Sequence, residues 1–96
     1  MPLFAITCSD APGVLEKRVA IRPAHVDYLK TVMPMIRLAG PRLDDEGKGC
    51  GSLFVVEAPD RAAAEAFSAA DPFTREGVFG KVEITAFNAT MGSWIA

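Results

Sequence analysis

The stretch MIRLAGPRLDDEGKGCGSLFVVEA, from Met35 to Ala58, contains two apolar runs joined by a polar, glycine-rich segment. The runs, residues 35–43 and 52–58, have the length and the aliphatic and β-branched content of strands. The segment between them, residues 44–51, carries three glycines and predicts the turn that would join two antiparallel strands. A strand pair in the middle of the chain therefore divides the remaining residues into two flanks.

The flank before this pair predicts a strand followed by a helix. LFAITC, residues 3–8, alternates between two faces as a strand does, and the residues SDAPG then interrupt it. A helical turn is expected over residues 16–20, and Pro23, at the first position that proline favours, is expected to begin a longer helix. This helix should continue to about Met33, because Pro34 cannot be accommodated in its interior.

The flank after the pair predicts a helix followed by a strand. Asp60 is a good N-cap for the alanine-rich run 61–70, and KVEITAF, residues 81–87, predicts the last strand. The order β-α-β-β-α-β is typical of the α+β ferredoxin-like fold, in which a four-stranded antiparallel sheet carries two helices on one face. We interpret the whole chain, residues 1–96, as a single domain of this type.

The third predicted strand indicates that both faces of the sheet are covered. A sheet with one solvated face alternates polar and apolar residues, but the residues from Leu53 to Val56 are all apolar. Leu53 and Val55 share one face and Phe54 and Val56 share the other, and the sequence does not decide which pair contacts the helices. Because two helices cover one face, we expect a second copy to cover the other in a homodimer.

Composition argues against several kinds of partner. Twelve acidic and ten basic residues give a net charge of −2, with no basic stripe for nucleic acid. No run approaches the ~18 apolar residues of a membrane helix, so we expect no membrane contact and a cytoplasmic location. Cys8 and Cys50 with one histidine do not make a usual zinc set, and we expect no metal and no cofactor. Reduced thiols and a Cys8–Cys50 disulfide both fit the sequence.

The only histidine, His25, follows Pro23 by two residues. A helix that begins at Pro23 places His25 half buried beside the apolar stripe, where it could simply pack. Asp71 precedes Pro72 and could simply cap a short turn. A helix N-terminus disfavours imidazolium, whereas a carboxylate on one ring nitrogen favours it and fixes the tautomer. The combination would give an oriented general base, so we predict that His25 and Asp71 meet and transfer protons.

Other chemistries have weaker support from the sequence. Ser52 lacks the G-x-S-x-G pattern of a nucleophile elbow. The glycine-rich residues 47–52 lead from one strand into another and not into a helix, so they do not predict a phosphate loop. Arg22 precedes a proline, which favours an extended backbone, and a solvated arginine is its ordinary interpretation.

Three segments together resemble the YciI-like (YCII-related domain) family. They are LEKRVAIRPAHVDYL at 15–29, AGPRLDDEGKGCGSLFVVEA at 39–58 and AFSAADPFTREGVFGKVEI at 66–84. Arg-Pro-x-His combined with Asp-Pro-aromatic is the specific part of the resemblance. It implies a ferredoxin-like dimer related to the dimeric α/β barrels, similar in fold to muconolactone isomerase. It also implies kinship with a dechlorinating enzyme of aromatic degradation.

The resemblance implies roles for individual residues. The family's catalytic pair falls on His25 and Asp71, and further family positions near the pocket fall on Arg22, Pro41, Ser52 and Phe73. The expected function is that of a cofactor-free lyase, isomerase or dehydrochlorinase for a small aromatic or anionic metabolite, which Arg22 or Ser52 would hold. The alternative is a non-catalytic ligand-binding or accessory dimer with a vestigial pocket. The tail, residues 88–96, departs from the basic-aromatic ending of many members.

Overall fold

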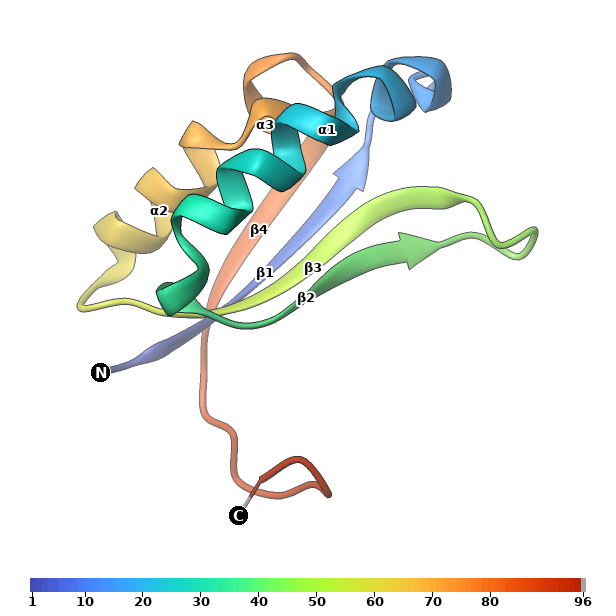
Figure 1. Cartoon of the computed structure of the whole chain (residues 1–96). Coiled ribbons are helices and arrows are strands. Elements are labelled where there is room, and N and C mark those ends of the chain that lie inside the picture. The colour runs from blue at the N-terminus through green and yellow to red at the C-terminus, as the bar shows by residue number, and fades with distance from the viewer. Residues whose placement is uncertain (96) are drawn as a thin grey trace.

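The computed structural model describes residues 1–95, which form a four-stranded antiparallel sheet with the helices on one face (Figure 1). The predicted α+β, ferredoxin-like order is confirmed, with two short helices added. The elements are β1 (Leu3–Asp10), α1 (Leu15–Thr31), η1 (Met33–Met35), β2 (Ile36–Leu43), β3 (Gly49–Glu57), α2 (Arg61–Ala70), α3 (Pro72–Arg75) and β4 (Phe79–Phe87). The strand order β2-β3-β1-β4 places β3 and β1 at the centre of the sheet.

The burial of β3 shows which side of the sheet faces the helices. Phe54 and Val56 are 2% and 0% exposed and belong to the hydrophobic core. Ile6 pairs with Phe54 across the two central strands and is equally buried. Leu53 and Val55 point to the opposite side, where Leu53 is 38% exposed. The question that the sequence left open is therefore decided in favour of Phe54 and Val56 as the helix-facing pair.

Helix α1 shows that the prediction of a helix beginning at Pro23 was wrong. The helix runs from Leu15 to Thr31, and Pro23 lies in its interior. Proline has no N–H for the carbonyl of Val19 and normally disrupts a helix there. Val19 is 66% exposed, so this turn of the helix faces solvent. Arg22 is helical and not extended, and His25 lies in the middle of the helix, away from the positive end of its dipole.

The junction between α2 and α3 is organised by two aspartates. Asp60 caps α2 as predicted, because its side chain accepts a hydrogen bond from the Ala63 N–H at 2.8 Å. Asp71 follows the last residue of α2 and caps α3, accepting from the Phe73 N–H at 2.9 Å. The turn between the two helices thus presents Asp71 and Phe73 toward α1, which lies beside α3 (Figure 1).

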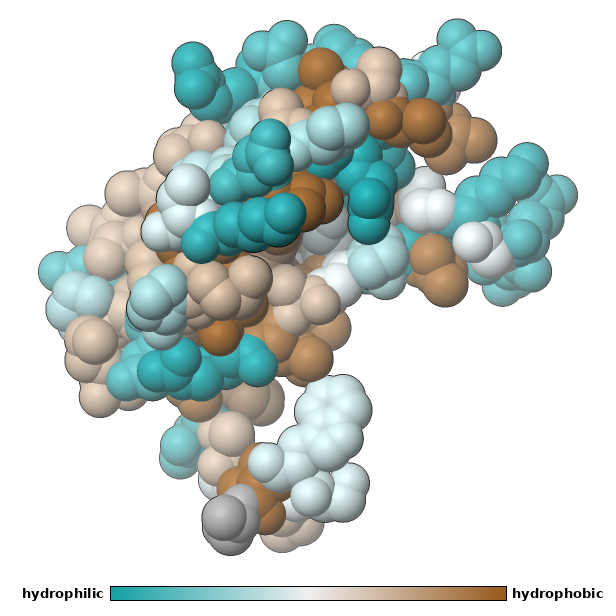
Figure 2. Space-filling model, viewed as in Figure 1, coloured by the Kyte–Doolittle hydropathy of each residue, from teal (hydrophilic) through white to brown (hydrophobic). Residues whose placement is uncertain are grey.

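The chain leaves the sheet after β4. Residues 88–95 stand apart from the body of the domain (Figures 1 and 2), and Met91 and Trp94 are 85% and 83% exposed. No helix within residues 1–95 has both the length and the apolar character needed to cross a membrane.

Candidate active site

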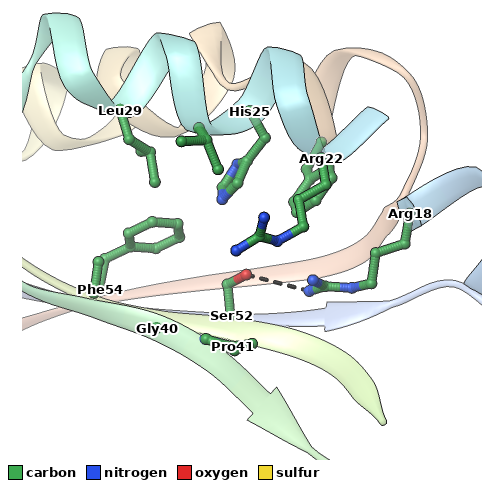
Figure 3. Close-up of a pocket in the computed structure, with 11 residues that line it drawn as sticks. Arg18, Arg22, His25, Leu29, Gly40, Pro41, Ser52 and Phe54 are labelled. Carbon is green, nitrogen blue, oxygen red and sulfur yellow. Dashed lines mark hydrogen bonds between the residues drawn. The ribbon is translucent and has the colours of Figure 1, made fainter. Parts of the chain in front are cut away.

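A cavity of about 200 Å³ lies between α1 and the strands β2 and β3 (Figure 3). Its walls include five of the six residues that the sequence singled out, namely Arg22, His25, Pro41, Ser52 and Phe73. Leu29 and Phe54 add apolar surface at one end. Asp71, the sixth residue, does not line the cavity and contacts it only through His25.

His25 and Asp71 are brought together by the packing of α1 against α3. The imidazole Nδ1 lies 2.7 Å from Asp71 Oδ1, and the two residues are 8% and 1% exposed. His25 is therefore more buried than the half-buried position expected from the helical wheel. The same carboxylate oxygen accepts the N–H of Phe73. The second oxygen, Oδ2, is buried and has no partner within residues 1–95.

These contacts define the hydrogen-bonding state of the imidazole. An ionised carboxylate can only accept, so a neutral His25 carries its proton on Nδ1 and leaves Nε2 as an acceptor. Figure 3 shows the imidazole directed into the cavity. No hydrogen bond to Nε2 is made by the residues that the structure describes. This nitrogen is placed to accept a proton from a molecule in the cavity.

Aromatic rings fix the plane of the imidazole. The phenyl ring of Phe73 stacks on it with 3.9 Å between the ring centres and 10° between the planes. Phe54 approaches edge-on, at 6.3 Å and 61°. One hydrogen bond and one stacked ring together determine both the position and the orientation of the His25 side chain.

The polar groups around the cavity come from opposite walls. Arg22, on α1, is exposed, and its guanidinium extends toward the side of the cavity that Ser52 forms (Figure 3). Ser52, on β3, is 3% exposed, and its Oγ accepts from Arg18 Nη2 at 3.3 Å. Pro41, on β2, pairs with Ser52 and extends the same wall. The cavity thus combines an exposed guanidinium, a hydroxyl and an imidazole with apolar walls.

Arg18 is a residue of this site that the sequence analysis did not select. Its guanidinium lines the cavity and forms an ion pair with Asp10, with Nε 2.6 Å from Oδ2 and both side chains 8% exposed. Arg18 lies seven residues before His25, which places both on the same face of α1. That spacing was the available signal, but an isolated arginine on a helix is ordinarily solvated.

The thiol and the phenol near the site are poor acids here. Burial, with smaller contributions from the carboxylates of Asp71 and Asp10, raises the pKa of Cys8 to about 12. Burial and the Asp71 charge also raise the pKa of Tyr28. Cys8 and Cys50 are both free, so the disulfide alternative is not realised. Among the residues that line the cavity, His25 is the side chain suited to accept a proton.

The strand order, with the helices on one face of the sheet, defines the class of protein, because this is the subunit fold of the dimeric α/β-barrel proteins. A solved structure of an antibiotic biosynthesis monooxygenase has the same fold, with a TM-score of 0.56 and 18% identity over 95% of this chain and 100% of that chain.

Within this class, a family model described as the YCII-related domain matches residues 2–88, and the chain belongs to that family. Protein YciI from Escherichia coli is 34% identical over 93 residues, which cover 88% of this chain and 95% of that protein. An uncharacterised protein from Haemophilus influenzae is 34% identical over 92 residues, covering 88% and 94%.

One solved relative has an assigned reaction in its name. The 5-chloro-2-hydroxyhydroquinone dehydrochlorinase TftG from Burkholderia phenoliruptrix, in complex with 2,5-dihydroxybenzoquinone, is 30% identical. Its TM-score is 0.85, and the match covers 92% of this chain and 95% of that chain. A dehydrochlorinase that is 30% identical to this chain is therefore built on a very similar backbone.

Proposed function

We propose that this protein is a cytoplasmic, cofactor-free enzyme that transfers a proton on a small aromatic or anionic metabolite, in lyase, isomerase or dehydrochlorinase chemistry. The observation that carries the proposal is the contact of 2.7 Å between His25 Nδ1 and Asp71, which leaves Nε2 directed at the cavity. The likeness to a dehydrochlorinase supports the reaction class. Two free cysteines are typical of a reducing compartment.

In this mechanism His25 is the general base. Its Nε2 accepts a proton from a hydroxyl or an acidic C–H of the substrate, and the ring becomes imidazolium. Asp71 holds the Nδ1 proton and stabilises the positive charge that forms. In an isomerisation the imidazolium returns the proton to another substrate atom. In an elimination the base removes the proton while the leaving group departs with the bond electrons.

The other cavity residues are suited to a planar anion. The guanidinium of Arg22 would neutralise a phenolate or enolate oxygen, and the Ser52 hydroxyl would bind a second oxygen. Phe54, Phe73 and Pro41 provide flat apolar surface for a ring. A cavity of about 200 Å³ has room for a single-ring compound, since a cavity of ~150 Å³ is known to admit benzene.

The proposal is tested by replacing the imidazole with a side chain that keeps its hydrogen bond. In His25→Asn the amide nitrogen can reach the position of Nδ1 and still donate to Asp71, but no basic nitrogen enters the cavity. We expect kcat/KM to fall about 10²–10⁴-fold, the usual contribution of a general base. Turnover is measured on single-ring hydroxylated compounds, beginning with 5-chloro-2-hydroxyhydroquinone, the compound named for the relative.

Arg75→Gln, a change on the exposed side of α3, is the matched control and should leave turnover unchanged. Turnover that survives His25→Asn would contradict the proposed base. Tight binding of such a compound without turnover, unaffected by His25→Asn, would favour the alternative of a non-catalytic ligand-binding dimer.

A homodimer formed through the outer sheet face is part of this proposal. The apolar part of the outer sheet face consists of Leu3, Ala5, Leu38, Leu53, Val55 and Phe87, and polar residues such as Thr7 and Glu83 lie on the same face. Leu38 and Leu53 are each 38% exposed and Phe87 is 47% exposed, on the side of the sheet that carries no helix. A hollow of about 840 Å³ between this face and residues 87–95 adds further apolar surface. An apolar sheet face of this kind is typical of an interface between identical subunits.

The dimer is tested with a charge on the outer sheet face. Val55→Asp should weaken the dimer about a hundredfold or more, because each subunit would bury an unpaired carboxylate in the interface. The helix-side core should remain folded, since Val55 points away from it. Sedimentation velocity and circular dichroism report the two effects separately. Ala62→Asp, on the exposed side of α2, is the control. An unmodified protein that sediments as a monomer at micromolar concentration would overturn this part of the proposal.

A further inference from the structure

Arg18 differs from the other pocket arginine in burial and in partners. Arg22 is exposed, whereas Arg18 is 7% exposed and its guanidinium is hydrogen-bonded on its polar edge. Nε donates to Asp10 at 2.6 Å, and Nη2 donates to the Gly51 carbonyl oxygen at 2.5 Å and to Ser52 Oγ at 3.3 Å. The guanidinium plane is thereby fixed to both central strands of the sheet, one turn of helix from Arg22 and two from His25.

The guanidinium of Arg18 lies over the same aromatic ring that stacks on the histidine. The guanidinium carbon of Arg18 lies 4.7 Å from the centre of the Phe73 ring. The imidazole of His25 stacks on the same ring at 3.9 Å, so Phe73 contacts both side chains. Arg18, Phe73 and His25 thus form a chain of contacts from α1 through α3 and back to α1.

We propose that Arg18 is a positioning residue for His25, acting through Phe73. The hydrogen bond to Asp71 fixes one ring nitrogen of His25, but a single hydrogen bond does not fix the plane of the ring. The plane is set by the stacked ring of Phe73. That ring is contacted by the guanidinium of Arg18, which hydrogen bonds to Asp10 and Gly51 keep in place. Arg18 also orients the hydroxyl of Ser52, so it links both polar walls of the cavity.

Lysine cannot replace arginine in this arrangement. An ammonium can keep the ion pair with Asp10, but it has no planar face to stack on Phe73 and no fork to hold Gly51 and Ser52 together. Arg18→Lys therefore keeps the positive charge beside Asp10 but removes the contacts that position the Phe73 ring. The effect of this variant on turnover rests on the proposed function, but its effect on the orientation of the imidazole does not, and the test below uses no substrate.

The test is an NMR measurement of the imidazole, whose signals assign themselves because His25 is the only histidine. In the unmodified protein the stacked ring of Phe73 should shift the imidazole C–H protons upfield, and Phe73→Leu should abolish this shift. We expect Arg18→Lys to lose much of the same upfield shift while the backbone amide spectrum stays that of the folded protein. Arg75→Lys, on the same short helix as Phe73, should leave the imidazole signals unchanged.

The double change Asp10→Asn with Arg18→Met removes both members of the ion pair and avoids leaving a buried carboxylate unpaired. It should also lose the upfield shift. Imidazole signals that stay unchanged in a folded Arg18→Lys or in the double variant would overturn the proposal. Loss of the folded amide spectrum in both would also overturn it, because Arg18 would then support the whole fold and not the ring.

Discussion

Gly51→Ala is expected to lower the free energy of unfolding by about 3 kcal/mol or more, although it adds one methyl group. A Cβ at position 51 would collide with the Cys8 carbonyl oxygen and lie 3.2 Å from its carbonyl carbon, so it meets backbone and not a mobile side chain. Relief requires the central strands β1 and β3 to separate. That movement would also disturb the Gly51 carbonyl, to which Arg18 donates. Urea denaturation followed by circular dichroism measures the effect.

Gly40→Ala is the matched control for this prediction. Gly40 lies on the neighbouring strand β2, and a Cβ there would have no atom within 4 Å. Its stability should stay within about 1 kcal/mol of the unmodified protein, because the added methyl reduces the entropy of the unfolded chain and meets nothing. Equal stability for the two alanine variants would show that β1 and β3 do not approach each other as closely as described.

Most of the fold could be predicted because its signals are local. Asp60 before an alanine-rich run indicates a capped helix, and its side chain forms that cap. The alternation of LFAITC indicates a strand with two distinct faces, and the face that carries Ile6 is the buried one. Strand bounds were less predictable, because β3 begins at Gly49, inside a segment whose glycines indicate a turn. Pairing with β2 and β1 extends that strand, and the sequence alone does not reveal pairing.

The uninterrupted helix α1 could not be predicted, because a local rule is overridden there by packing. Pro23 breaks an isolated helix, but α1 is held along its length by the core beneath it. His25 and Arg18 are both buried on its inner face, on either side of the proline. The positive end of the helix dipole, which was expected beside His25, therefore lies about three turns away from it. The charged group that prepares His25 to act as a base is Asp71, which contacts Nδ1.

The candidate site was partly predictable, because some of its residues are recognisable from the local sequence and others are not. His25 and Asp71 could be selected because a lone histidine and an aspartate before a proline are rare, chemically distinctive features. Arg18 could not, since its importance comes from its contacts with Asp10 and Phe73, which form only in the folded chain. The sequence also did not indicate that Asp71 both caps α3 and contacts His25. Its side chain caps α3 and contacts His25 through the same oxygen, so the two interpretations are compatible.

That shared oxygen gives the second large effect, which is expected for Asp71. Asp71→Ala removes the cap of α3 and the partner of His25 in one change. Losing a cap costs about 0.5–2 kcal/mol, and losing a buried hydrogen bond to a charged group costs about 1.5–3 kcal/mol. We expect the free energy of unfolding to fall by roughly 2–5 kcal/mol. Turnover should fall with it, because the imidazole loses the hydrogen bond that fixes its tautomer and the position of Nδ1.

Asp71→Asn removes the negative charge of the side chain but keeps its shape and its hydrogen-bond acceptor. The Phe73 N–H can only donate, so the asparagine oxygen must occupy the position of Oδ1, where it also accepts from His25 Nδ1. The amide nitrogen then takes the place of Oδ2, which lacks a partner within residues 1–95 of the unmodified protein as well. The stability loss should be smaller than for alanine. The tautomer of His25 should be preserved, and nitrogen NMR shifts of the single imidazole report it directly.

The preserved tautomer limits the expected loss of turnover in Asp71→Asn. In the Ser-His-Asp triad the equivalent change costs ~10⁴-fold because the histidine adopts the wrong tautomer. Here the Phe73 N–H prevents that change, so only the stabilisation of imidazolium by the carboxylate is lost, and kcat should fall by about 10²-fold or less. An imidazole that carries its proton on Nε2 in this variant would contradict the assignment of Oδ1 as a shared acceptor. A kcat unchanged in both Asp71 variants would show that Asp71 serves α3 and not the histidine.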